Sequence, residues 1–80
     1  MKANVYVTLK QEVLDPQGNA VRRALGTLGF GTVRTARVGK LIELEVDATD
    51  RTAAEKDLRT MCEKLLCNPV IEDFRFEIVG

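Results

Sequence analysis

The sequence has no histidine and no tryptophan, and it contains only two cysteines and one tyrosine. Without histidine, neither a Ser-His nor a Cys-His pair can form, which excludes the common nucleophilic centres. Acid–base chemistry would fall to carboxylates, lysines or Tyr6, and one close acid pair is Glu43 and Glu45. These glutamates are two residues apart in a strand pattern, so the solvent-facing side of a strand explains them without catalysis.

The two cysteines, Cys62 and Cys67, lie in or at the end of one predicted helix. Helical residues five apart are separated by roughly 140° in projection, so we expect the two thiols to point in different directions and not to form a disulfide. Two cysteines alone cannot complete the four-ligand zinc site that proteins usually build. We therefore interpret both as small hydrophobic residues, and the sequence predicts no metal or cofactor in this chain.

The chain also lacks net charge, a long apolar run and sufficient length for a second domain. Its 12 Lys and Arg balance 12 Asp and Glu, without a block of either sign. Nucleic-acid binders usually carry a basic excess, and membrane-surface segments are polybasic, so we expect neither nucleic acid nor membrane as a partner. No apolar run reaches spanning length and no signal peptide is recognisable, so we expect a cytoplasmic protein. Residues 1–80 should form a single domain with a thin core, which favours oligomerisation.

Hydrophobic periodicity predicts strands where apolar residues alternate and helices where they recur at helical spacing. The expected strands span residues 3–10, 32–38, 41–46 and 71–79, and the expected helices span residues 16–28 and 52–66. Asp15 is the expected N-cap of the first helix, and Gly29 suits the left-handed position that ends it. For the second helix, Thr52 begins a capping box with Glu55, and Asp50 is a rival N-cap.

This order, βαββαβ, predicts an α+β sandwich of the ferredoxin-like type, with an antiparallel sheet and two helices on one face. Gly39-Lys40 fits a type II′ hairpin between the second and third strands, but one long strand bent at Gly39 is equally compatible. The open sheet face would present Tyr6, Leu41 and Val79. Such a part-apolar face is suited to dimerisation, which would complete or cover the sheet.

Two loops have residues that are also found at ligand sites. The glycines between Gly26 and Gly31 follow a helix, whereas phosphate loops precede one, so they indicate a helix stop. Asp15-Pro16-Gln17-Gly18 precedes a helix and suits a small-ligand regulatory domain, although an N-cap explains it without a ligand. RNA binding is the weaker alternative, because the predicted sheet offers only Tyr6 for base stacking.

Several stretches together resemble the PurS family over nearly the whole chain. The most specific are Leu14-Asp-Pro-Gln-Gly18 near the start and Asn68-Pro-Val-Ile-Glu72 near the end. The others are Val5-Tyr-Val-Thr-Leu-Lys10, Leu28-Gly-Phe30 and Val38-Gly-Lys40.

The resemblance implies a non-catalytic small subunit of phosphoribosylformylglycinamidine synthase, an ATP-dependent ligase of purine biosynthesis. It implies a PurL-type synthetase subunit that binds ATP and Mg²⁺, a PurQ-type glutaminase subunit that releases ammonia, and self-association to a dimer or tetramer. The small subunit would bridge the other two and support ammonia transfer. Exposed loops on a rigid scaffold often carry binding, so we expect partner contacts at the loops that hold Arg37, Gly39, Lys40, Asn68 and Pro69.

Overall fold

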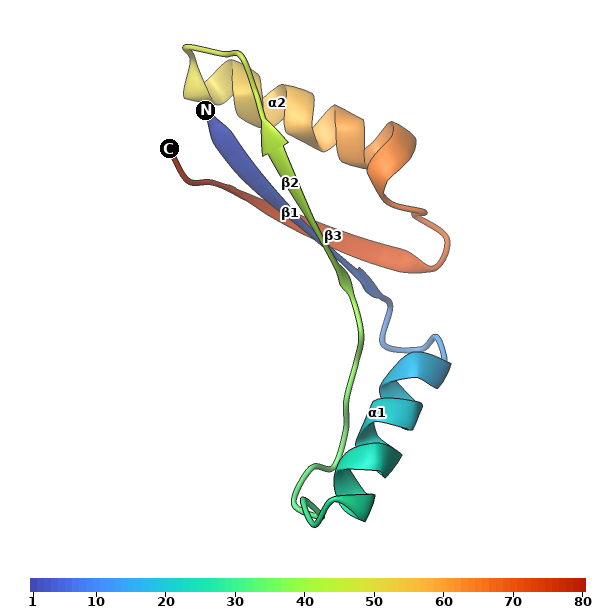
Figure 1. The fold of residues 1–80 in the computed structure, drawn as a ribbon. Helices are drawn as coiled ribbons and strands as arrows, with labels where there is room; N and C mark the ends of the chain where they lie inside the picture. The colour runs from blue at the N-terminus through green and yellow to red at the C-terminus, as the bar shows by residue number, and fades with distance from the viewer.

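The computed structural model describes residues 1–80 as an antiparallel sheet with two helices (Figure 1). Its elements are β1 (Lys2–Leu9), α1 (Pro16–Thr27), β2 (Lys40–Glu45), α2 (Arg51–Met61), the π-helical turn η1 (Cys62–Leu66) and β3 (Glu72–Ile78). This arrangement confirms the predicted α+β class and is consistent with a ferredoxin-like fold. Neither helix has the length and apolar character needed to span a membrane.

Strand β1 lies in the centre of the sheet, in the order β2-β1-β3, and is antiparallel to both neighbours. Val5 pairs with Ile42 on one side and with Phe76 on the other, so apolar residues of all three strands share one face. Helix α2 and η1 cover that face through Leu58 and Cys62, both fully buried. The core is therefore a single layer between the sheet and the second helix.

The opposite sheet face is open, as the alternation predicts. Tyr6 pairs with Leu41 and Arg75, which places their side chains together on this face. Leu41 is 53% exposed and Val79 is 50% exposed. The expectation that these residues point away from the core is confirmed.

The expected strand over residues 32–38 is not part of the sheet, which has three strands and not four. In Figure 1 this segment follows the loop after α1 and runs extended into β2, without reversing direction. Gly39 has no positive φ, which a type II′ hairpin requires at its first central residue, so the hairpin is excluded. Because β1 ends at Leu9, the segment has no strand in its own chain to pair with.

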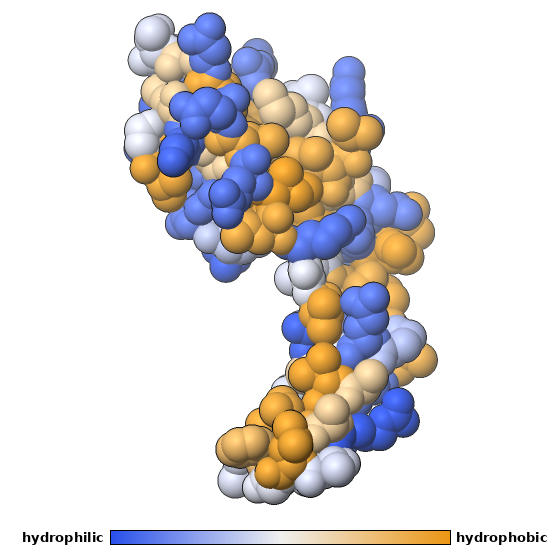
Figure 2. All heavy atoms as spheres, viewed as in Figure 1, coloured by the Kyte–Doolittle hydropathy of each residue, from blue (hydrophilic) through white to orange (hydrophobic).

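The expectation that both helices cover one sheet face holds for α2 and is wrong for α1. Residues 16–38, which we call the arm, project beyond the end of the sheet and contain α1 and the extended segment (Figure 1). Only Gly18 of α1 is buried, and the apolar stripe of this helix remains open, with Val21 43% and Leu28 71% exposed. Figure 2 shows apolar side chains gathered at the far end of the arm.

The ends of α1 follow the predicted caps. The Asp15 carboxylate accepts a hydrogen bond from the Gly18 amide at 2.9 Å. At the other end, Gly29 has φ of 99°, and the Phe30 amide donates to the Leu25 carbonyl at 2.9 Å. The Gly29 amide also donates to the Gly26 carbonyl, which completes a Schellman motif.

Helix α2 begins two residues earlier than a capping box at Thr52 predicts. The Asp50 carboxylate accepts from the Thr52 amide at 3.1 Å, so Asp50 is the N-cap and the expected role of Thr52 is wrong. The predicted helix continues to Leu66, but its last turn widens into η1.

The widened turn changes where the cysteines point. The Cys67 amide donates to the Cys62 carbonyl at 3.0 Å, five residues back, and both side chains are buried in the same cluster. The expectation of divergent thiols is therefore wrong, because it assumed regular α-helical spacing. Both cysteines are free, as predicted.

Candidate functional site

Three loops meet at one end of the sheet, because β1 runs antiparallel to both neighbours. Its last residues pair with the first residues of β2 and β3, as Val7 with Lys40 and Leu9 with Glu72. We call the surface formed by residues 10–15, 37–40 and 68–72 the loop end. All the sequence-predicted partner residues lie there: Arg37, Gly39, Lys40, Asn68 and Pro69.

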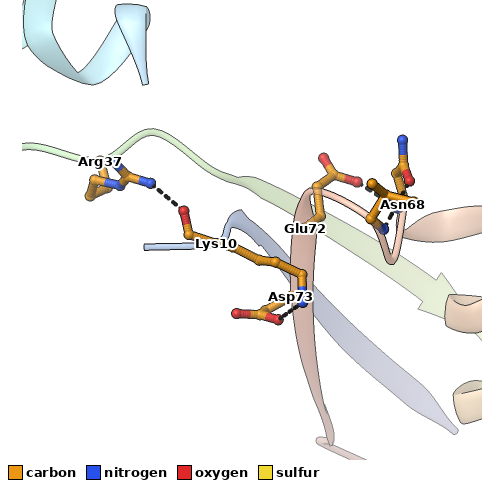
Figure 3. Close-up of polar contacts among 6 residues, drawn as sticks. Lys10, Arg37, Asn68, Glu72 and Asp73 are labelled. Carbon is orange, nitrogen blue, oxygen red and sulfur yellow. Dashed lines mark hydrogen bonds and ion pairs between the residues drawn. The ribbon is translucent and has the colours of Figure 1, made fainter. Parts of the chain in front are cut away.

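Glu72, the last residue of the motif that begins at Asn68, connects two of these residues, although it was not among the predicted partner residues. Its Oε2 lies 3.6 Å from the Lys40 ammonium. Its Oε1 accepts from the Asn68 amide at 2.7 Å, the contact drawn in Figure 3. The Glu72 side chain is only 15% exposed, whereas that of Lys40 is 61% exposed. Glu72 thus fixes the turn at Asn68 and leaves Lys40 facing solvent.

Arg37 is turned toward its own chain. Its Nη2 donates to the carbonyls of Lys10 and Val13, both at 2.9 Å. The Lys10 ammonium in turn lies 3.5 Å from an Asp73 carboxylate oxygen (Figure 3). Arg37 therefore fastens the arm to the loop after β1.

Gly39 and Pro69 have different roles at the loop end. A Cβ on Gly39 would meet the Val7 carbonyl oxygen at 2.7 Å, so glycine permits the close approach at the start of β2. Pro69 is exposed and borders a shallow cleft with Lys10 and Arg59. Of the five predicted residues, Lys40, Asn68 and Pro69 thus face outward.

Asp15 is the buried polar residue of the loop end, with 4% of its surface exposed. Beyond capping α1 at Gly18, its second oxygen accepts from the Val38 amide at 2.8 Å. The Gly18 amide, and next the Val38 amide, hold the pKa of this carboxyl below its usual range. The sequence indicated the cap, but nothing in it signalled the contact across 23 residues.

A cleft of about 520 Å³ lies beside Asp15 and is also bordered by Gln17, Val38 and Lys40. Its volume falls in the range of small-molecule sites. Both Asp15 oxygens, however, are already bonded to amides of the same chain. The predicted ligand loop therefore uses its carboxylate internally.

The remaining reactive side chains are placed structurally. Burial raises the pKa of both the Cys62 and the Cys67 thiols, which disfavours the nucleophilic thiolate. No group of three or more Cys, Asp or Glu side chains is arranged to hold a metal ion. Glu43 lies on the open sheet face, where it pairs in register with Asn4.

The open sheet face carries one small polar cluster. The Tyr6 hydroxyl donates to a Glu77 carboxylate oxygen at 2.7 Å, and the Arg75 guanidinium lies 3.9 Å above the Tyr6 ring. The hydrogen bond to Glu77 raises the pKa of Tyr6, and the same bond lowers the pKa of Glu77. This cluster orders the open face.

The fold, the open apolar arm and the loop end together define a small α+β interaction domain. A family model described as PurS, phosphoribosylformylglycinamidine (FGAM) synthase, matches residues 2–80. The chain belongs to the PurS family.

Relatives from distant organisms agree with this assignment. The PurS subunit of phosphoribosylformylglycinamidine synthase from Synechocystis is 50% identical over 76 residues, covering 95% of this chain and 76% of the relative. The Bacillus subtilis subunit is 48% identical over 77 residues, covering 96% of this chain and 90% of the relative. The structure of PurLQS from Thermotoga maritima contains a chain that matches with a TM-score of 0.89 at 33% identity, covering 98% and 95% of the two chains.

Two glycines of α1 provide a matched test of the arm's base. A Cβ on Gly18 would meet the Ala36 carbonyl oxygen at 2.1 Å, whereas a Cβ on Gly26 meets nothing within 4 Å. We expect Gly18→Ala to lower the free energy of unfolding by about 1–3 kcal/mol through overpacking. Gly26→Ala should raise it by up to about 1 kcal/mol through better helix propensity. Urea unfolding followed by circular dichroism measures both, and equal effects would contradict the close contact at Gly18.

Tyr6 allows a direct test of the open-face cluster, because it is the only tyrosine in a chain without tryptophan. Its pKa should lie above the ordinary value of 10.0, since ionisation would break the bond to Glu77 and oppose two negative charges. Glu77→Ala should lower this pKa, and Arg75→Ala should raise it further. The ultraviolet absorbance of tyrosinate against pH reports the value. An identical midpoint in all three proteins would contradict the cluster.

Proposed function

We propose that this chain is the non-catalytic small subunit of an FGAM synthase complex and bridges a PurL-type synthetase and a PurQ-type glutaminase. The observation that carries the proposal is the family match over residues 2–80, together with the close likeness to a chain in PurLQS of Thermotoga maritima. The reaction served is the conversion of formylglycinamide ribonucleotide to formylglycinamidine ribonucleotide. ATP and Mg²⁺ belong to the large partner, and a complex that consumes ATP in purine synthesis functions in the cytoplasm.

The loop end is the proposed surface for these partners. Lys40, Asn68 and Pro69 are exposed there, on turns whose backbone is fixed by Glu72 and by the adjoining strands. Arg37 and Gly39 contribute by holding the shape of the loops and not by reaching outward. Rigid presentation favours binding, because little conformational freedom remains to be lost on association.

A second copy of this chain is the proposed partner of the arm. Only 9 of 80 residues are buried in the isolated chain, and its longest extent is 49 Å. Val21, Leu28 and Phe30 leave apolar surface open on the arm, and the extended segment leaves backbone groups unpaired. Apolar surface and an open backbone edge are both relieved by pairing with another chain. A homodimer and a homotetramer both satisfy this requirement.

Reconstitution of the complex tests the bridging role. Purified PurL-type and PurQ-type proteins from the same organism are assayed for synthase activity with glutamine or with ammonium, with and without this chain. Glutamine-dependent activity should require the chain, because ammonia must pass between two separate active sites. Ammonium-dependent activity should be nearly independent of it. Glutamine-dependent turnover that is the same without the chain would contradict the bridging role.

Reversal of the charge at Lys40 tests the loop end as the partner surface. Lys40→Glu should weaken formation of the three-protein complex by about tenfold or more, because like charges then oppose across a former contact. The free energy of unfolding should fall by no more than about 1 kcal/mol, since the Lys40 side of the ion pair with Glu72 is exposed to solvent. Size-exclusion chromatography of the mixture measures assembly.

Lys56→Glu is the matched control, because Lys56 is exposed in the middle of α2 and carries the same charge change. Complex formation by Lys40→Glu equal to that of the control would exclude the loop end from the interface.

A further inference from the structure

The two ends of the arm are joined through one side chain. Asp15 immediately precedes α1, and its two carboxylate oxygens bond to amides at opposite ends of the arm. One oxygen accepts from Gly18 in the first turn of α1, and the other accepts from Val38 where the extended segment reaches the sheet. An N-cap requires only the first of these bonds.

We propose that Asp15 is a positioning residue that latches the two ends of the arm together and thereby fixes the direction in which the arm meets a second copy of this chain. The consequence for assembly rests on the proposed self-association, whereas the latch itself is a property of the single chain.

Two neighbouring contacts support the latch. Arg37, adjacent to Val38, bonds to the carbonyls of Lys10 and Val13 in the loop that leads to Asp15. Ala36 lies close against Gly18, because a Cβ on Gly18 would meet the Ala36 carbonyl oxygen at 2.1 Å. Three consecutive residues of the extended segment thus contact the chain on either side of Asp15. These contacts at the base of the arm set the orientation of the rest of the arm, including the exposed Leu28 and Phe30.

The latch needs a carboxylate and not merely a capping residue. The amides of Gly18 and Val38 bond to different oxygens of the Asp15 side chain, and an ionised aspartate presents an acceptor at both positions. Asparagine caps helices as well as aspartate does, but its side chain has one acceptor oxygen and a donating NH₂ group. Asp15→Asn should therefore keep the helix cap at Gly18. At the other position it places the side-chain NH₂ group, a donor, against the Val38 amide, which is also a donor. This substitution separates the latch from the cap.

The first measurement is made on the full chain by nuclear magnetic resonance. Asp15→Asn should leave α1 helical by circular dichroism and speed hydrogen exchange of the Val38 amide by about 10- to 100-fold, the loss expected for a bond to a charged acceptor. Residual dipolar couplings of α1 should no longer fit the alignment of the sheet. Asp50→Asn is the control, because Asp50 caps α2 through one bond and carries the same charge change. Unchanged Val38 exchange and unchanged α1 couplings in Asp15→Asn would overturn the latch.

The second measurement is the dissociation constant of self-association by sedimentation. Asp15→Asn should raise it by about tenfold relative to wild type and to Asp50→Asn, because only the correctly directed fraction of arms is competent to pair. A loosened arm with an unchanged dissociation constant would overturn the positioning role. If the wild-type chain stays monomeric, the proposed self-association is wrong. Hydrogen exchange at the Val38 amide and the dipolar couplings of α1 then still test whether Asp15 holds the two ends of the arm together.

Discussion

Every strand pairing in this protein passes through β1. Because β1 is bordered by β2 and β3 and is antiparallel to both, its buried Val5 and Val7 form the floor of the core, on which Leu58 rests. The same geometry brings the start of β2 and the start of β3 to the end of β1. The loop end exists because of this pairing, since its loops come from distant parts of the sequence. One constraint therefore provides both the core and the candidate partner surface.

Elements with a strong local signal were predictable from the sequence. Alternating residues located both ends of β1, β2 and β3 to within one residue, and Asp15 and Gly29 marked the ends of α1 as the structure has them. Residues 32–38 show why such signals are limited. Their side chains alternate as in a strand, but a strand also needs a neighbouring strand to pair with. The single chain provides no such neighbour beside residues 32–38. The same limit applied to α1, whose apolar stripe was expected to face the sheet and instead faces outward.

Residues of the candidate site could be proposed from the sequence, but their arrangement in space could not. The five loop residues were named from the sequence, but it did not predict that they lie together. It also did not predict that Glu72, the last residue of the Asn68–Glu72 motif, connects Lys40 and Asn68. The contact of Asp15 with Val38 was also not predictable, since it joins residues far apart in sequence. The cysteines were misjudged because one π-helical turn changes the angular spacing on which the argument relied. Pairwise tertiary contacts and local helix geometry are the information that periodicity omits.

The pairing of the two chain ends has a consequence for biosynthesis. Ala3 pairs with Ile78, and the Val79 amide donates to the Lys2 carbonyl, so the first and last strands lie side by side. During translation β1 leaves the ribosome first and must wait for β3, the last strand to be made. Until then, one edge of β1 lacks its neighbouring strand. The sheet is thus completed only once β3 has been synthesised, and such long-range pairing slows folding relative to a helical bundle of equal length.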